Sequence, residues 1–142
     1  MIILDTNVLS ALMRSEPEDV VVRWLDRQPA ESVWTTSVTV FEARFGIALP
    51  PQGARRKTLE QSFARLLQED LGNRILDFDG AAASEAAALA AARQTAGRPV
   101  DFRDTQIAGI ALSRHASIAT RNVRHFQGLK IAVVDPWKAG ER

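Results

Sequence analysis

The 142-residue sequence contains no cysteine, which excludes disulfide bonds, zinc sites with thiolate ligands and thiol nucleophiles. It also contains no tyrosine, and aromatic residues make up only 6% of the chain, so an extended surface for stacking unpaired bases is not expected. The 18 basic and 17 acidic residues leave a net charge of +1. Any contact with nucleic acid must therefore come from a local group of cations.

Long apolar runs and nucleotide-binding loops are missing as well. The opening apolar run stops at Asp5, and no later run approaches the roughly 20 residues that cross a membrane. Neither a Walker-type GxxxxGK loop nor a GxGxxG fingerprint occurs. The length and a hydrophobic content of 46% are typical of one domain that spans residues 1–142. We expect a cytoplasmic protein with no membrane association.

Short apolar runs alternate along the chain with longer segments of helical periodicity. The predicted strands are residues 2–4, 33–35, 74–76, 117–120 and 131–134. The predicted helices are residues 8–13, 18–28, 37–49, 57–71, 81–96 and 105–115. Strands separated by helices indicate βαβ units. The prediction is a three-layer α/β/α domain with a central, mainly parallel sheet of about five strands.

Three acids and an amide lie near the ends of predicted strands. Asp5 directly follows the first strand, and Glu42 lies about one and a half turns into the helix after the second. Asp104 opens the helix before the fourth strand, and Asn122 follows that strand. Ligands of parallel sheets bind at the edge where the carboxyl ends of the strands meet, so we expect these four side chains to converge on one small cleft.

Clustered carboxylates predict a cation. Two carboxylates about 5 Å apart repel each other by roughly 3 kcal/mol at an effective dielectric constant near 20. A fold keeps such a cluster only where a proton or a cation relieves the repulsion. Oxygen ligands without cysteine select a hard ion, which favours Mg²⁺, with Mn²⁺ as a second possibility. Water bound to such an ion can attack a phosphorus atom.

Each acid, taken singly, has a simpler interpretation. Asp5 and Asp104 are both suited to cap a helix, and Glu42 to lie on the surface. Glu42 is harder to explain in this way, because it interrupts the otherwise apolar stretch 38–43. Asp101 competes with Asp104, but the apolar residues that follow Asp104 lie on one face of its helix and favour it. Two further acids follow the third strand and are interpreted as turn residues, Asp77 and Asp79.

Four motifs, in order along the chain, are similar to those of a known family. They are ILDTN at 3–7, SVTVFEARFG at 37–46, DTQIA at 104–108 and ATRN at 119–122, followed by DPW at 135–137. With them the chain resembles the PIN-domain ribonucleases, and most closely the VapC-type and FitB-type toxins of bacterial toxin–antitoxin pairs. The resemblance implies a metal-dependent endoribonuclease with Asp5, Glu42 and Asp104 as its acidic core. It also implies a homodimer and inhibition by a small antitoxin protein.

One position departs from the family pattern. Many relatives have a fourth acid where this chain has Asn122, and an amide can ligate a cation only weakly or through water. We therefore expect one well-held Mg²⁺, and a second ion is in doubt. Hydrogen bonds from Thr6, Asn7 and Thr120 can orient the acids, although helix capping and turn formation explain these three residues equally well.

Basic residues follow the candidate acids in the sequence. Arg121, Arg124 and His125 lie beside the amide, while Arg98 and Arg103 flank the loop that precedes the last acid. We predict that Arg121, Arg124 and Arg103 hold RNA phosphates through contacts that weaken with salt.

The leading hypothesis is the toxin of a type II toxin–antitoxin pair, a Mg²⁺-dependent endoribonuclease that hydrolyses RNA phosphodiester bonds with metal-activated water. The alternative is a catalytically weak binding module of the same fold, which acts through its antitoxin partner in DNA-bound autoregulation. The missing fourth acid at Asn122 is the feature that favours this alternative.

Overall fold

The computed structural model describes residues 1–14 and 16–139, and five strands within them form one sheet. The strand order is β3-β2-β1-β4-β5, and every neighbouring pair is parallel. The strands are β1 (Ile2–Leu4), β2 (Val33–Thr36), β3 (Ile75–Leu76), β4 (Ser117–Ala119) and β5 (Val133–Val134). All of the predicted strands are present, although β5 is two residues shorter at its start than the predicted run.

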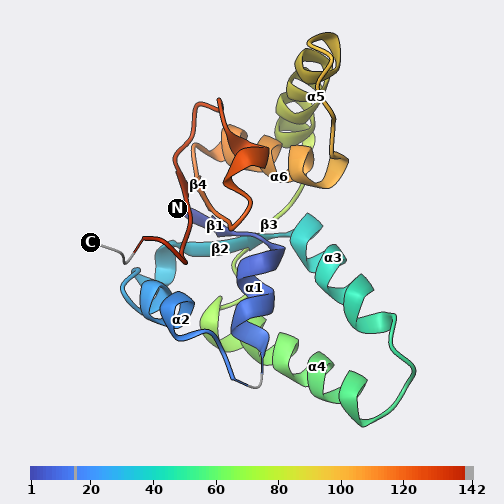
Figure 1. The fold of residues 1–142 in the computed structure, drawn as a ribbon, viewed down its shortest axis with the longest axis vertical. Coiled ribbons are helices and arrows are strands. Elements are labelled where there is room, and N and C mark those ends of the chain that lie inside the picture. Colours follow the sequence, from blue (N-terminus) through green and yellow to red (C-terminus); the bar gives the residue numbers. More distant parts are fainter. Residues whose placement is uncertain (15, 140–142) are drawn as a thin grey trace.

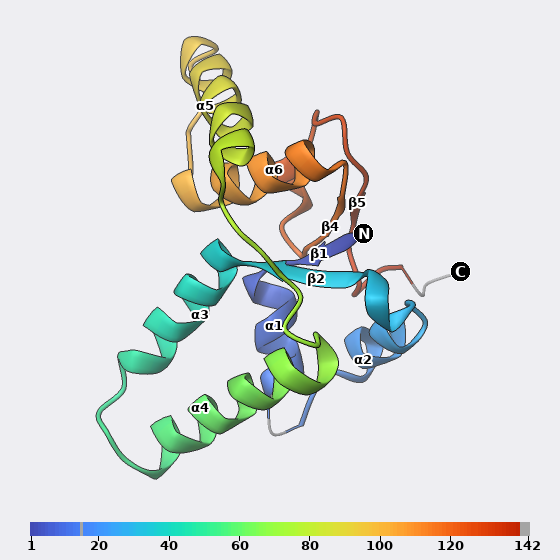
Figure 2. The same ribbon diagram turned by 180° about the vertical axis from the view of Figure 1, so that it is seen from behind.

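Helices cover both faces of this sheet. Those in the described residues are α1 (Thr6–Met13), α2 (Asp19–Asp26), α3 (Ser37–Ala48), α4 (Ala54–Arg65), α5 (Gly80–Thr95) and α6 (Phe102–Arg114). Shorter helical turns are η1 (Ala30–Ser32), η2 (Leu66–Asp70) and η3 (Val123–Phe126). Figures 1 and 2 show α1, α2 and α4 on one side of the sheet and α5 and α6 on the other. None of these helices is long and apolar enough to span a bilayer within the described residues.

Alternation along the strands divides the core between the two faces. Leu4 and Ala119 pack into the cluster that lies against α1, α2 and α4. Their neighbours Ile3 and Ile118 pack into the cluster on the side of α5 and α6. Successive strand residues point to opposite faces, so three-residue strands suffice to supply both cores. The predicted three-layer α/β/α fold class is confirmed.

The helix starts differ from the prediction in two places that matter for function. The carboxylate of Asp5 caps α1 by accepting a hydrogen bond from the Val8 amide at 3.1 Å, so the cap is not Thr6 or Asn7. Helix α6 begins at Phe102, and its cap is Asp101. The prediction that Asp104 opens this helix is therefore wrong by two residues.

The contact between α5 and α6 is unusually close because small residues face each other across it. A Cβ atom added to Gly109 on α6 would lie 2.5 Å from the carbonyl oxygen of Ala82 and 2.8 Å from the Cβ of Ala86, both on α5. Only glycine fits at this position. The alanine enrichment of α5 is thereby explained by packing as well as by helix propensity.

Candidate functional site

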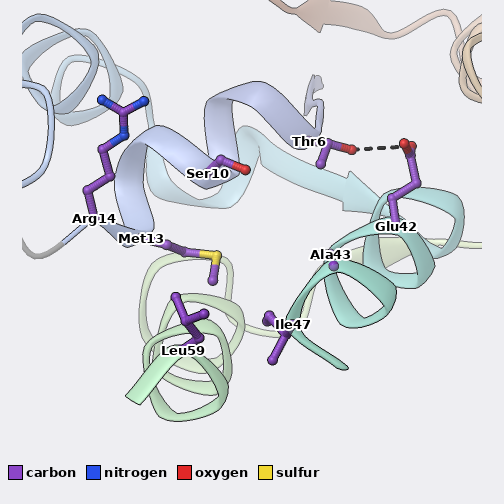
Figure 3. A pocket seen from close by; sticks show the side chains of 9 residues that line it. Thr6, Ser10, Met13, Arg14, Glu42, Ala43, Ile47 and Leu59 are labelled. Carbon is purple, nitrogen blue, oxygen red and sulfur yellow. Dashed lines mark hydrogen bonds between the residues drawn. The ribbon is translucent and has the colours of Figure 1, made fainter. Parts of the chain in front are cut away.

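The three candidate acids meet at the edge of the sheet where β1, β2 and β4 end. Asp5 follows the middle one of these three strands, since β1 lies between β2 and β4. Glu42 comes from α3, which follows β2, and Asp104 comes from the first turn of α6. The hydroxyl of Thr6 donates a hydrogen bond to Glu42 at 3.2 Å and so links α1 to α3 (Figure 3).

Asp5 is the buried member of the group, with only 6% of its surface exposed. The Thr120 hydroxyl at the end of β4 donates a hydrogen bond to one carboxylate oxygen, and the Val8 amide donates to the other. Burial raises the pKa of Asp5 from 3.8 to about 6. The negative charge of Asp104 raises it further, whereas the hydrogen bonds lower it.

Glu42 and Asp104 are less buried than Asp5, and each of them contacts a basic side chain. Burial raises the pKa of Glu42, while the Thr6 hydroxyl and Arg103 lower it; the Arg103 guanidinium lies 3.6 Å from the carboxylate. Burial also raises the pKa of Asp104, against the effect of a close contact with Nδ1 of His125. Because the charge of Asp104 raises the pKa of both other acids, the three carboxyls form one electrostatic unit.

The chemistry of these donors fits a hard divalent cation. All three are carboxylates with raised pKa values, and an ion would relieve both their desolvation and their mutual repulsion. Their present arrangement is open: within residues 1–14 and 16–139, no three His, Asp or Glu side chains lie close enough together to hold a metal ion. Glu42 and Asp104 contact Arg103 and His125, respectively, each through one carboxylate oxygen.

The other predicted ligands and orienting residues divide into two groups. Thr6 and Thr120 both donate hydrogen bonds to the acids, as described above. Asn7 is exposed, and it acts on Asp5 through its backbone, which lowers the pKa of that carboxyl. Asn122 is also exposed, and its amide N–H donates to the Thr120 hydroxyl oxygen at 2.9 Å. The Asn122 side chain makes no hydrogen bond to the acids among the described residues.

The predicted RNA-binding cations lie on both sides of the acids. Arg103 is paired with Glu42, whereas Arg121 stacks on the ring of Trp137, with 4.7 Å between its guanidinium carbon and the ring centroid. Arg124 lies on the exposed turn η3 and lines a cavity of about 230 Å³ together with Asp104. The contact between His125 and Asp104 was not predicted, because η3 joins residues that lie 21 positions apart in the chain.

A second feature that was not predicted is an apolar groove beside the acids. It has a volume of about 280 Å³ and lies between α1, α3 and α4 (Figure 3). Met13, Ile47 and Leu59 line its apolar part, while Glu42 and Thr6 stand at one end of it.

Comparison with known proteins identifies the class. A family model described as "PIN domain" matches residues 2–130, and the chain belongs to this family. It is 39% identical to "Plasmid stability protein StbB" of Pseudomonas syringae pv. tomato, over 98% of this chain and 100% of that protein. It is 35% identical to "VapC ribonuclease Y4jK" of Sinorhizobium fredii, over 97% of this chain and 99% of that protein.

A solved structure gives the same result. "Structure of FitAB bound to IR36 DNA fragment" contains a chain that superposes with a TM-score of 0.85 at 34% identity, covering 96% of both chains. The resemblance that the four sequence motifs indicated is therefore confirmed.

Proposed function

We propose that this chain is the toxin of a type II toxin–antitoxin pair and that it hydrolyses phosphodiester bonds in RNA with the help of Mg²⁺ or Mn²⁺, in the cytoplasm. The observation that carries the proposal is the placement of Asp5, Glu42 and Asp104 at one edge of the sheet, where the charge of Asp104 raises the pKa of the other two. Three desolvated carboxyls of raised pKa are unfavourable for stability and favourable for binding a cation. The name of the S. fredii relative, a ribonuclease, supports the same reaction.

In this proposal Asp5, Glu42 and Asp104 hold the ion, and Asn122 contributes weakly or through a water molecule. When bound, the ion would activate a water molecule and neutralise charge on the phosphoryl oxygens. Thr120 fixes the orientation of Asp5, and Thr6 that of Glu42, so that fewer side-chain conformations compete with the binding geometry.

The partners of the acids have a second role in the proposal. Arg103 compensates the charge of Glu42, and His125 contacts Asp104. Once these two acids bind the ion, Arg103 becomes available for a phosphate oxygen of the RNA, which is the role predicted for it from the sequence.

Two exposed apolar surfaces support protein partners. An antitoxin segment bound in the groove that ends at Glu42 would also reach the acids, and the name of the FitAB structure describes a two-component assembly.

The outer face of α3 carries Phe41 and Phe45, whose stacked rings are 6.2 Å apart, and the nearby start of α6 carries Phe102, which is 72% exposed. We assign this aromatic face to a homodimer contact. Sedimentation should show a dimer that Phe45→Asp converts to a monomer.

The decisive experiment for the reaction is incubation of total cellular RNA with the purified chain, followed by mapping of the new ends. We expect cleavage with Mg²⁺, none in EDTA and none with Asp104→Asn. Full cleavage in EDTA, or by Asp104→Asn, would contradict the proposal.

The alternative is a PIN-fold module with little catalysis, which acts through its antitoxin in DNA-bound autoregulation. The observation in its favour is the DNA fragment bound in the FitAB structure, together with the amide at position 122. Absence of metal-dependent cleavage across many RNAs, combined with tight binding of the antitoxin and of operator DNA by the pair, would favour this alternative.

A further inference from the structure

A second polar cavity lies beside the acids, on the side of β4 and β5. Its volume is about 430 Å³, and we call it the β4–β5 pocket; its principal lining residues are Arg121, Asn122, Arg124, His125, Asp135 and Lys138. Two of its residues connect it directly to the acids. The backbone N–H of Asn122 donates to the Thr120 hydroxyl oxygen, the Thr120 hydroxyl donates to Asp5, and His125 contacts Asp104. The pocket and the acidic site thus share a wall.

The charge of the β4–β5 pocket is predominantly positive. Arg121, Arg124 and Lys138 line it, and none of them takes part in the ion pairs that form among the described residues. The acid of the lining, Asp135, accepts a hydrogen bond from the backbone N–H of Trp137 at 2.9 Å. A cavity lined by three cations that form no ion pair among the described residues, and by one acid, favours an anionic ligand over a cation.

Arg121 is held in place before any ligand arrives. Its guanidinium lies over the ring of Trp137, and that ring packs against the buried core on the α1 side of the sheet. The indole N–H donates to the carboxylate of Glu18, which fixes the ring from its other edge. A stacked guanidinium keeps its N–H groups in its own plane, where they can meet two oxygens of a phosphate.

We propose that the β4–β5 pocket binds a phosphate group of the RNA strand that neighbours the phosphate being cleaved. This inference rests on the proposed ribonuclease function. None of the three acids lines the pocket, which places a phosphate bound there beside the acidic site. Arg121, Arg124 and Lys138 contact its oxygens, and Trp137 is a positioning residue for Arg121. Recognition of the backbone suits a chain with few aromatic side chains for stacking on bases.

The test measures RNA binding without cleavage. The full-length chain is titrated into a short fluorescein-labelled single-stranded oligoribonucleotide in EDTA, and anisotropy is recorded over a series of salt concentrations. We expect Arg121→Ala, Arg124→Ala and Lys138→Ala each to weaken binding about fivefold to tenfold and to reduce the slope of log K against log salt by about 0.7. The matched controls are Arg55→Ala and Lys57→Ala at the start of α4, which Figures 1 and 2 place far from β4.

A second set of variants tests Trp137. We expect Trp137→Phe to retain binding, since phenylalanine keeps a ring under the guanidinium, and Trp137→Ala to lose as much affinity as Arg121→Ala. The double variant Arg121→Ala with Trp137→Ala should lose no more than either single variant, because both changes remove one interaction. A structural role for Trp137 alone would instead give additive losses, and would overturn its assignment as a positioning residue.

The outcomes separate this proposal from the proposed function. If the pocket variants bind the oligoribonucleotide like Arg55→Ala while the wild type cleaves RNA with Mg²⁺, the pocket is not a phosphate site, although the enzyme is real. If they lose affinity but no RNA is ever cleaved, the pocket stands as an RNA contact and the proposed hydrolysis fails. Tighter binding of a DNA probe of the same sequence, with the same dependence on these residues, would overturn the assignment to RNA.

Discussion

Asp5 and Asp104 lie at the same edge of the sheet, but they differ in burial and in the residues that they contact. Asp5 is buried, and it caps α1 while it accepts the Thr120 hydrogen bond at the end of β4. Asp104 is only partly buried and contacts His125, a side chain from a short turn. The first acid is therefore fixed by the sheet itself, whereas the second depends on a partner that can leave. In the proposed metal site, Asp5 would therefore be the preorganised ligand, and Glu42 and Asp104 the less constrained ones.

The largest effect is expected from removing the charge of either acid. Asp5→Asn and Asp104→Asn should each lower the rate of RNA cleavage by about a thousandfold or more, because a metal-assisted step loses several kcal/mol of stabilisation. Gel analysis of RNA cleavage with Mg²⁺ measures this. The control is Asp77→Asn, an exposed acid after β3, which should cleave like the wild type. Equal activity of Asp104→Asn and the control would remove Asp104 from the site.

The pH dependence of stability tests how strongly burial affects Asp5. Its pKa is raised from 3.8 to about 6 in the folded chain, so the folded state binds a proton more tightly than the unfolded state. The unfolding free energy should therefore fall as the pH rises through this window, by about 3 kcal/mol. Urea unfolding in EDTA at several pH values measures the change. In Asp5→Asn the decrease in unfolding free energy that is due to Asp5 should be absent. If the unfolding free energy of the wild type does not change over this pH range, burial does not raise the pKa of Asp5.

Metal binding should reverse that loss of stability. Millimolar Mg²⁺ or Mn²⁺ at a hundredfold excess over its dissociation constant should stabilise the fold by about 2.7 kcal/mol. Thermal unfolding with and without the ion measures the increase. Asp5→Asn should show little of it, while Asp77→Asn should show all of it. If neither ion raises the melting temperature of the wild type, the acids do not gather around a cation.

The smallest effects are expected from the two threonines whose hydroxyls contact Asp5 and Glu42. Thr120→Val removes the hydroxyl that orients Asp5 and should lower cleavage or metal affinity by about tenfold to a hundredfold. Thr6→Val should cost less, because Glu42 is less buried than Asp5 and also contacts Arg103. Kinetic assays over a range of Mg²⁺ concentrations compare the two with Thr58→Val, whose hydroxyl bonds only within α4. A larger loss for Thr6→Val than for Thr120→Val would mean that Asp5 is not the preorganised ligand.

Much of the fold and the location of the acids could be predicted from the sequence. Short apolar runs mark strands reliably here, because each strand supplies both core layers and has few polar residues. The position of Asp5 then follows, since the residue after the first strand of a parallel sheet lies at the ligand-binding edge. The identity of the α1 cap did not follow, because Asp5, Thr6 and Asn7 can all cap a helix.

The side chains that contact the acids could not be predicted from the sequence. Asp101 and Asp104 lie in the same helical turn, and only the structure shows that the first caps the helix while the second faces His125. The contact between Arg103 and Glu42 depends on the relative placement of α3 and α6, which no local pattern encodes. The roles of the acids, the amide at 122 and the cations remain predictions for experiment.

The close contact of α5 and α6 has a consequence for mutational tolerance. Gly109 has no room for a side chain against Ala82 and Ala86, so the spacing of the two helices is set by residues that carry no reactive group. Asp104 lies in the first turn of α6, and a bulkier residue at the contact would have to separate α6 from α5. Saturation mutagenesis read out by toxicity should therefore find inert small residues on α5 almost as intolerant of substitution as the acids.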